Sequence, residues 1–507
     1  MFSKVLVANR GEIAVRVQQT LKTLGIATVA VYSDADSSAP HVLMADEAWA
    51  LDGQTAEETY LDIEKIIAVA RRCGAEAVHP GYGFLSENPR FARACENAGI
   101  TFIGPTPENM EALGDKISSK ALAQRAGAPV VPNSPVCSQI DAAVEQFIAA
   151  WGFPLLVKAA AGGGGRGMRL VNGLEELAPA LESAGREAHA AFGDGRVFLE
   201  RYIPRPRHVE FQVLADGFGN TVHLLERDCS IQRRYQKIIE ETPSPALTPE
   251  LRRRMGEAAV AVAQAAGYVN AGTVEFLLDP DSAEEGGGFY FLEMNTRLQV
   301  EHPITEEVLG LDLVEWQVRI ASGERLAFGQ DGVQARGHAV ECRIYAEDPY
   351  HDFLPSVGKL VKWLPPSGPG LRLDSGVVQG QEISSHYDPL LAKLIAWGPD
   401  RPSSLARMDL ALSQFPVLGL VTNIPFLRQV IRSPGFQRGD YDTGLLTRDP
   451  GLGRPESSEG SLDLAQALAA WAAGGVSSQR QPVQPGRAPS FQDQNNPWLT
   501  AGKLRLP

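Results

Sequence analysis

Residues 291–303 read FLEMNTRLQVEHP, and this stretch decides how the middle of the chain folds. Its first half has the composition of a buried strand, in which successive side chains lie on opposite faces. Strict alternation predicts that Phe291, Glu293 and Asn295 share one face. Because an unpaired carboxylate is costly to bury, Glu293 is expected to face a compensating positive charge.

A second strand pattern, NAGTVEFLLD, occupies residues 270–279 and is joined to the first by a polar connection. The two strands are expected to be antiparallel neighbours, with Glu275 beside Glu293. Two carboxylates about 4 Å apart repel each other by roughly 4 kcal/mol at an effective dielectric constant of 20. Mg²⁺ or Mn²⁺ reverses this cost, because hard cations bind carboxylate and amide oxygens. We therefore predict that Glu275, Glu293 and Asn295 bind a metal ion that bridges to ATP. The alternative is an ion pair between Glu293 and an arginine.

Residues 155–171, LLVKAAAGGGGRGMRLV, have the pattern of a strand, a glycine-rich loop and a second strand. The Gly-Lys-Ser/Thr sequence of a P-loop is missing. Consecutive glycines can present backbone N–H groups to phosphate oxygens, and they can also act as a hinge. Lys158 adds a positive charge at the end of the incoming strand. This stretch therefore predicts a mobile phosphate-binding lid, and the alternative is a flexible surface hairpin.

The first 114 residues alternate between strand and helix patterns. KVLVAN and IATVAVYS have strand composition, and GEIAVRVQQTLKTLG between them has helical periodicity that ends at Gly25. This order predicts a doubly wound, parallel α/β unit of the Rossmann type. The dinucleotide fingerprint is absent, because the first strand leads into ANRGEIA with a single glycine. We therefore expect a scaffold at this position and not an NAD site.

The chain has 507 residues, which is too long for one hydrophobic core. Its net charge of −14 argues against binding to nucleic acid or to an anionic membrane. No stretch reaches the roughly 18 apolar residues of a membrane span. The cysteines lack metal-ligand spacing, so they are expected to be reduced thiols of a cytoplasmic protein. They are Cys73, Cys95, Cys137, Cys229 and Cys342.

Several longer motifs point to one family: ANRGEIAVRV, HPGYGFLSEN, RDCSIQRRYQKIIEETPSP, FLEMNTRLQVEHPITE, GHAVECRIYAED, YDPLLAKLIAWG and TNIPFL. Together they resemble the biotin carboxylases of the ATP-grasp superfamily, over residues 1–448. The resemblance implies a mixed fold, α/β and α+β, with three domains followed by a partly disordered linker or tail. These are a Rossmann-like N-terminal domain (1–114), an ATP-grasp domain (115–335) with its mobile glycine-rich lid at about 130–205, a biotin carboxylase C-terminal domain (336–448) and the tail (449–507).

The resemblance implies ATP-dependent carboxylation of biotin, in which bicarbonate reacts through carboxyphosphate. Arg297 matches a guanidinium that binds the planar anion, and Glu301 matches the base that deprotonates bicarbonate. Arg343 matches the residue that stabilises negative charge on the ureido oxygen of biotin. Lys237 matches a further catalytic anion contact. The implied bicarbonate and biotin residues are Tyr82, Gly83, Lys237, Arg297, Gln299, Val300 through its backbone, Glu301 and Arg343.

The resemblance also implies a nucleotide site and assigns the metal to the same three residues predicted above. The implied nucleotide contacts are Lys116, Lys158, Gly164, Gly165, Met168, Glu200, Arg201, Ile203, His208, Gln232 and Tyr235. At the position of Tyr235 the family commonly has histidine. A phenol can hydrogen-bond to the nucleotide but carries no positive charge, so nucleotide affinity is expected to differ. The bicarbonate and biotin chemistry is not expected to change.

Biotinylation requires a lysine in an AMKM-like hairpin, and the sequence contains none. Lys503 is the only lysine after Lys393, and its surroundings, TAGKLRLP, do not match. Biotin is therefore expected as a substrate on a carrier domain or protein, either in a longer α chain or in a separate polypeptide. The tail resembles α chains of the methylcrotonyl-CoA or geranyl-CoA carboxylase type. This implies that the partners include a carboxyltransferase subunit, and that the protein forms a homodimer or larger assembly.

Two other functions remain open. One is a different ATP-grasp ligase that makes an acyl phosphate, such as a carbamoyl-phosphate or purine-pathway enzyme. The other is a non-catalytic, nucleotide-binding scaffold of a carboxylase complex. The run from Arg297 to Glu301, together with Arg343, argues against the first, and the intact metal-ligand set argues against the second.

Overall fold

The computed structural model describes residues 1–160, 168–282, 288–449 and 451–453. The chain divides into two compact units, Met1–Arg454 and Pro455–Pro507, and the described elements all belong to the first. Most of the expected tail lies outside the described residues, as do Gly164 and Gly165 of the predicted lid. Within the described part, no helix is long and apolar enough to cross a membrane.

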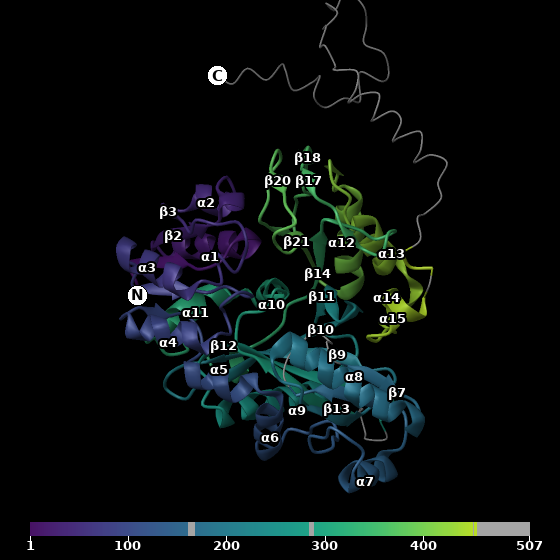
Figure 1. The fold of residues 1–507 in the computed structure, drawn as a ribbon. Helices are drawn as coiled ribbons and strands as arrows, with labels where there is room; N and C mark the ends of the chain where they lie inside the picture. Colours follow the sequence, from purple (N-terminus) through teal and green to yellow (C-terminus); the bar gives the residue numbers. More distant parts are fainter. Residues whose placement is uncertain (161–167, 283–287, 450, 454–507) are drawn as a thin grey trace, which may run out of the picture. The chain divides into compact units, whose positions relative to one another are not determined.

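The N-terminal part contains a five-stranded parallel sheet in the order β3-β2-β1-β4-β5, which confirms the predicted Rossmann-like unit (Figure 1). Helices α3 and α4 pack on one face of the sheet, and α1 packs with α11 on the other. The strands are β1 (Lys4–Val7), β2 (Ala27–Tyr32), β3 (Glu47–Ala50), β4 (Ala77–His79) and β5 (Thr101–Phe102). The helices are α1 (Gly11–Thr23), α2 (Pro40–Met44), α3 (Ile63–Cys73), α4 (Pro89–Asn97) and α5 (Pro107–Gly114). The turn after α1 contains the predicted Gly25, whose φ of 71° lies in the left-handed region.

The segment predicted as the lid contains a separate three-stranded antiparallel sheet in the order β7-β6-β8. Strands β6 and β7 pair as a hairpin around the glycine-rich loop, as the sequence predicts, and the loop itself lies outside the described residues. Helices α7 and α8 pack on this sheet and give it a small hydrophobic core of its own. The bounds are α6 (Lys116–Arg125), α7 (Ala142–Trp151), β6 (Leu155–Ala159), β7 (Arg169–Val171), α8 (Leu174–Phe192) and β8 (Val197–Arg201).

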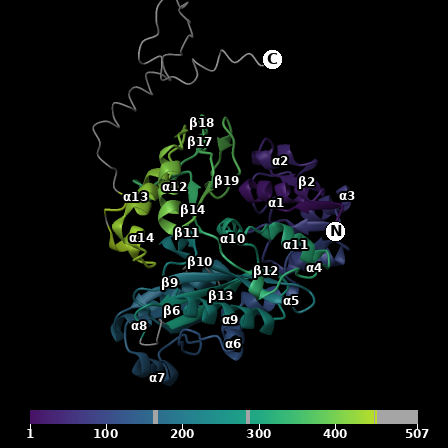
Figure 2. The same cartoon turned by 180° about the vertical axis from the view of Figure 1, so that it is seen from behind.

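An eight-stranded antiparallel sheet forms the centre, in the order β13-β12-β9-β10-β11-β14-β21-β19 (Figure 2). Its strands are β9 (Arg207–Ala215), β10 (Thr221–Arg233), β11 (Gln236–Thr242), β12 (Asn270–Asp279), β13 (Gly288–Asn295), β14 (His338–Tyr345), β19 (Leu371–Ser375) and β21 (Leu390–Gly398). The β11–β14 pairing joins the region predicted as ATP-grasp to the region predicted as the C-terminal domain. The division between residues 335 and 336 stays a prediction, since one sheet continues across it.

Pairing between β12 and β13 confirms the predicted neighbours and corrects one detail. Glu275 lies opposite Glu293, whereas Phe276 lies opposite Phe291. Leu292 has no partner in this register, so β13 contains a bulge at that position. The extra residue turns Phe291 into the hydrophobic core, and the expectation that it shares a face with Glu293 is therefore wrong.

Helices cover the large sheet, with α9 on β9 and β10, α10 on β10, β11 and β14, and α12 on β21. They are α9 (Pro249–Ala265), α10 (His302–Leu309), α11 (Leu313–Ala321), α12 (Arg401–Ser413), α13 (Ile424–Arg432), α14 (Pro434–Arg438) and α15 (Leu445–Arg448). Three two-stranded pairs complete the fold: β15 (Glu347–Asp348) with β16 (Leu354–Pro355), β17 (Gly358–Lys359) with β20 (Glu382–Ile383), and β18 (Lys362–Trp363) with β22 (Val417–Leu418). All five cysteines are buried and unpaired with one another.

A buried carboxylate on β11 connects this strand to β14 and α12. Glu241 accepts hydrogen bonds from Arg401 and Tyr441, and it lies 2.7 Å from Nε2 of His338. Burial opposes ionisation of Glu241, but His338 and Arg401 outweigh burial and lower its pKa to about 2. The carboxylate is therefore charged in the folded protein and stabilises the junction.

We expect Glu241→Gln to lower the free energy of unfolding at pH 7 by about 3 kcal/mol, the energy that corresponds to a pKa of about 2 instead of 4.5. A depressed carboxyl pKa stabilises the fold above pH 4.5, and this contribution is lost as the pH falls towards 2. Urea unfolding between pH 7 and pH 3 should therefore show a difference from wild type that shrinks at low pH. Glu382→Gln, at an exposed position, is the matched control. A difference that stays constant with pH would contradict the assignment.

Candidate active site

The predicted metal ligands come together on β12 and β13. Glu275 and Glu293 lie directly opposite each other, and Asn295 Nδ2 donates a hydrogen bond to Glu275 Oε1 over 2.9 Å. The half-buried carboxylate of Glu293 pairs with Lys116 Nζ at 3.5 Å, so its partner is a lysine and not the arginine of the alternative. Two carboxylates and an amide are hard oxygen donors, and this set fits Mg²⁺.

Lys237 on β11 is the centre of a buried ion cluster. Its ammonium group bonds to three carboxylates, those of Glu210 at 2.5 Å, Glu275 at 2.9 Å and Glu301 at 2.7 Å. Burial opposes protonation of Lys237, but these carboxylates raise its pKa well above the usual range. Two further groups of potential metal ligands lie among the described residues, namely His208, Glu210 and Glu275, and Glu210, Cys229 and Glu301. The lysine ammonium already supplies the positive charge between their carboxylates.

The cluster fixes the charge of Glu301. Burial alone would raise the pKa of Glu301, but Lys237 and then Arg343 outweigh burial and hold this pKa well below the usual range. Glu210 behaves differently, because burial and then repulsion from Glu301 raise its pKa. Glu301 is therefore a carboxylate, which is the form that can accept a proton.

Arg343 on β14 contacts Glu301 from the opposite side. Its NH2 group donates to Glu301 Oε2 over 2.9 Å, and its Nε donates to Glu240 Oε1 over 2.6 Å. Alternate residues of β14 pack into the hydrophobic core, which leaves Arg343 on the opposite, polar face of the strand. Burial raises the pKa of Glu240 to about 7, although Arg343 acts in the opposite direction.

Arg297 and Gln299 form the part of the site next to the N-terminal sheet. Arg297 Nε donates to Glu87 Oε2 over 2.9 Å, and its NH1 donates to Gln299 Oε1 over 2.7 Å. Gln299 Nε2 in turn donates to Glu275 Oε1 over 3.1 Å. A continuous series of hydrogen bonds and ion pairs therefore joins the two guanidinium groups: Arg297, Gln299, Glu275, Lys237, Glu301 and Arg343.

Two lysines meet at a buried carboxylate of the predicted nucleotide site. Lys158 on β6 and Lys120 on α6 both form ion pairs with Glu200. Burial opposes ionisation of Glu200, but these lysines outweigh burial and lower its pKa. Arg201, the next predicted residue, instead pairs with Asp279 at 3.6 Å. Of this segment, the Glu200 side chain lies beside two positive charges, and the Arg201 side chain lies beside a carboxylate.

His208 and Gln232 connect the predicted nucleotide contacts to the ion cluster. His208 Nε2 lies 2.8 Å from a carboxylate oxygen of Glu275, and its Nδ1 lies 2.7 Å from Gln232 Nε2. Burial acts to lower the pKa of His208, but Glu275 raises it above the usual value. Tyr235, by contrast, is 58% exposed and has no hydrogen bond to the cluster among the described contacts.

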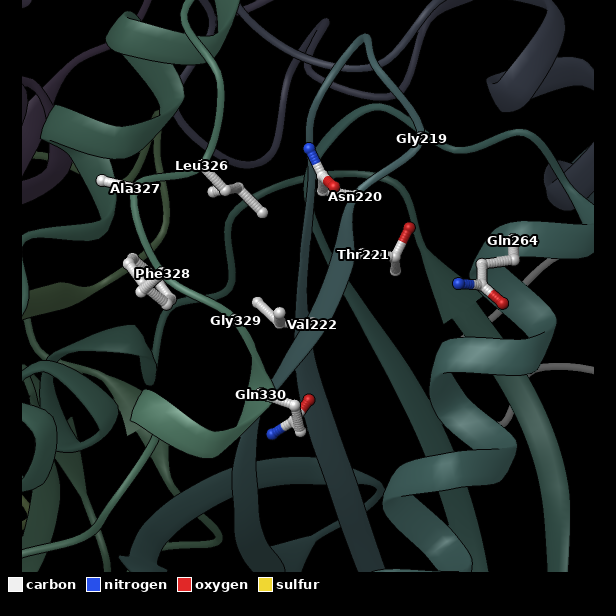
Figure 3. A pocket seen from close by; sticks show the side chains of 10 residues that line it. All are labelled: Gly219, Asn220, Thr221, Val222, Gln264, Leu326, Ala327, Phe328, Gly329 and Gln330. Carbon is white, nitrogen blue, oxygen red and sulfur yellow. The ribbon is translucent and has the colours of Figure 1, made fainter.

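The remaining predicted residues lie around these groups. Tyr82 and Gly83 follow β4, and the ring of Tyr82 lies 5.8 Å from Lys393 Nζ. Ile203 is buried after β8, and Met168 is half-buried before β7. A separate surface hollow of about 550 Å³ lies at the turn between β9 and β10. Figure 3 shows the side chains that line it. None of the predicted residues lines this hollow, and its lining has no ionisable side chain, so the charged cluster is the candidate active site.

Sequence reasoning missed four charged residues of the site, which are Glu210, Arg227, Glu240 and Lys120. Arg227 is fully buried and donates to Glu210 Oε1 over 2.6 Å. Alternation along β9 could have identified Glu210, because it lies two residues after His208 and therefore on the same face. Arg227 and Glu240 lie within the motif RDCSIQRRYQKIIEETPSP, which could have drawn attention to them, whereas Lys120 meets the site only through its contact with the distant Glu200.

Known protein families match this chain over most of its length. Three family descriptions match: "Biotin carboxylase, N-terminal domain" over residues 1–110, "Carbamoyl-phosphate synthase L chain, ATP binding domain" over 115–328, and "Biotin carboxylase C-terminal domain" over 341–448. The biotin carboxylase of Nostoc sp. is 51% identical over 445 residues, which are 88% of this chain and 98% of that protein. The mitochondrial methylcrotonoyl-CoA carboxylase alpha chain of Dictyostelium discoideum is 47% identical over 99% of this chain and 70% of its own length.

A solved structure of a related protein has the same fold as this chain. The crystal structure of the biotin carboxylase domain dimer of Hydrogenobacter thermophilus 2-oxoglutarate carboxylase, in complex with MgADP, ADP and bicarbonate, superimposes with a TM-score of 0.85. That domain is 48% identical in sequence and covers 90% of this chain and 100% of its own length. Motifs, site geometry, relatives and fold all lead to one assignment: the chain belongs to the biotin carboxylase family.

Proposed function

We propose that the protein catalyses ATP-dependent carboxylation of biotin, with bicarbonate as the carbon source. The observation that carries this proposal is the continuous series of contacts from Arg297 through Glu301 to Arg343, beside the paired carboxylates of Glu275 and Glu293. In this proposal, the series provides an anion-binding guanidinium, a base and a second guanidinium for one site. It lies next to oxygen donors that suit a metal–nucleotide complex.

Each residue of the series has a chemical role in this proposal. Arg297 binds bicarbonate through its planar fork, and Gln299 and the Val300 backbone orient it. Glu301 takes the proton of bicarbonate, and Arg343 stabilises the negative charge that develops on the ureido oxygen of biotin. Bound Mg²⁺ supplies charge neutralisation for the phosphates, and it would be held by the metal ligands Glu275, Glu293 and Asn295.

The nucleotide contacts of the proposal are Lys116, Lys158, Gly164, Gly165, Met168, Glu200, Arg201, Ile203, His208, Gln232 and Tyr235. Lys116 pairs with Glu293 and Lys158 pairs with Glu200, and the positive charges of both lysines suit the phosphate groups of a nucleotide. The residues around Tyr82 and Gly83 form the biotin side of the site. Lys237 neutralises the anion beside Glu301.

The proposed chemistry and the related proteins indicate which partners this protein needs. Biotin is bound to a carrier domain or protein, and a carboxyltransferase subunit uses the carboxylated product. The match to the Dictyostelium alpha chain over 99% of this chain supports the methylcrotonyl-CoA type, and the Hydrogenobacter domain dimer supports a homodimer or larger assembly. Five free thiols support a reducing, cytoplasmic location.

The test is phosphate release from ATP in the presence of Mg²⁺, with and without bicarbonate and with and without free biotin. We expect phosphate release to require bicarbonate and to increase when biotin is added. Phosphate release that requires ammonia or glutamine and ignores biotin would identify a carbamoyl-phosphate type of ligase instead. Nucleotide binding without any turnover would indicate a scaffold.

A further inference from the structure

Lys393 lies in the middle of β21 and is completely buried, although no role in the reaction assigned above requires it. Its ammonium group has three oxygen neighbours from three different elements. Nζ donates to the carbonyl oxygen of Val300 over 2.9 Å, and it lies 3.2 Å from Glu12 Oε1 and 3.7 Å from Asp374 Oδ2. Lys393 therefore joins α1, β19 and the turn that carries Glu301.

The three distances indicate which contact matters most. A lysine that served only to neutralise Glu12 and Asp374 would lie closest to their carboxylates. The shortest contact is instead the neutral carbonyl of Val300, beside the proposed base. Asp374 also has another cation, since Arg372 donates to both of its oxygens. Charge neutralisation alone does not account for this arrangement.

The carbonyl that Lys393 holds belongs to the peptide unit between Val300 and Glu301. A peptide unit is planar, so fixing the direction of this carbonyl also fixes the position of the Glu301 nitrogen and Cα. The preceding carbonyl, that of Gln299, is held in the same way by Nδ1 of His302 at 2.7 Å. Both carbonyls of the turn are thus fixed by buried side chains that take no part in the ion cluster.

We propose that Lys393 is a positioning residue that orients the Val300–Glu301 peptide, and through it the Cα of Val300 and the carboxylate of Glu301. The inference rests on the proposed function, because it assigns a role in bicarbonate use at that site. Loss of the ammonium group leaves the metal ligands and the nucleotide lysines in place. We therefore expect the substitution to weaken the affinity for bicarbonate and to leave the affinity for ATP unchanged.

The test compares Lys393→Met with the double variant Lys393→Met/Glu12→Gln. Burial raises the pKa of Glu12 to about 7, with Lys393 opposing, so the second substitution removes a carboxyl group that the first leaves without its cation. We expect the double variant to regain thermal stability but not bicarbonate use. Its KM for bicarbonate should stay raised by about 10-fold to 100-fold, the range for losing a group that orients a ligand without touching it. Its affinity for ATP should equal that of the wild type.

Three further variants complete the design. Glu12→Gln alone keeps the bond from Lys393 to Val300 and should leave the KM for bicarbonate near the wild-type value. Lys359→Met removes an exposed lysine and should change neither property. Lys393→Arg keeps charged donors and should restore part of the affinity for bicarbonate.

Three results would overturn the inference while the wild-type enzyme remains active. These are an unchanged KM for bicarbonate in the double variant, a loss of ATP affinity in the same proportion, or a folded Lys393→Arg enzyme as impaired as Lys393→Met. Failure of the proposed function is distinguishable, since wild-type enzyme would then release no phosphate in response to bicarbonate. That result would remove the inference together with the function.

Discussion

Glu301→Gln should abolish bicarbonate-dependent ATP cleavage, with a loss on the order of 10³-fold or more, while ATP still binds normally. The expected loss lies within the roughly 10²- to 10⁴-fold contribution of a general base. Glutamine has nearly the same shape as glutamate but cannot take up a proton at neutral pH. The substitution therefore tests the proton transfer and not the shape of the site.

The environment of Glu301 explains how a carboxylate with a depressed pKa can act as a base. Lys237 and Arg343 hold the pKa of Glu301 well below the usual range, although burial opposes them. Bicarbonate brings a negative charge next to the same cations and so offsets their effect on Glu301. Binding of the substrate should thus raise the pKa of Glu301 at the moment when a base is needed.

The variant should remain folded, because neither cation loses its last partner. Lys237 keeps Glu210 and Glu275, and Arg343 keeps Glu240. The measurement is phosphate release as a function of bicarbonate concentration, together with ATP affinity and thermal unfolding. Glu307→Gln, on helix α10 directly after Glu301 but outside the cluster, is the matched control and should retain activity. Turnover close to wild type in Glu301→Gln would remove this residue from the mechanism.

The paired strands of the site were predictable, and the details of their register were not. Alternation in residues 270–279 and 291–295, separated by a polar connection, predicts an antiparallel pair with Glu275 beside Glu293, and the structure confirms this pair. The bulge at Leu292 was not predicted, because composition does not indicate which residue a strand leaves unpaired. Its effect is local, and it turns Phe291 from the polar face to the core.

The residues that hold the site were harder to predict than the residues that line it. The motif around Arg297 and Glu301 is continuous in sequence, so a resemblance identifies it directly. Glu87 and Lys393 come from positions more than 90 residues away from their partners, as the contacts Arg297–Glu87 and Lys393–Val300 show. Such contacts arise only when segments that are distant in the sequence pack together, and periodicity within one element does not predict them.

Arg343→Ala should lower biotin-dependent phosphate release by about 10²- to 10³-fold, the loss expected when one preorganised charge-stabilising donor is removed. The slower, biotin-independent cleavage of ATP should be retained, because Glu301 and Arg297 remain in place. Arg343 lies between Glu301 and Glu240, so its removal leaves one fewer cation beside both carboxylates. A fall in the two rates by the same factor would mean that Arg343 acts on bicarbonate and not on biotin.

The same variant also allows a loss of activity to be distinguished from a loss of stability. Burial raises the pKa of Glu240 to about 7, and Arg343 acts in the opposite direction. Without Arg343 the pKa of Glu240 should rise further, so that Glu240 is protonated at neutral pH. The variant then contains no unpaired, buried carboxylate at this position. Adding Glu240→Gln to Arg343→Ala should therefore leave thermal stability nearly unchanged and should not restore carboxylation. If the second substitution did restore it, the loss in Arg343→Ala would come from a misplaced Glu240 carboxylate. The guanidinium group would then have no direct part in stabilising charge on biotin.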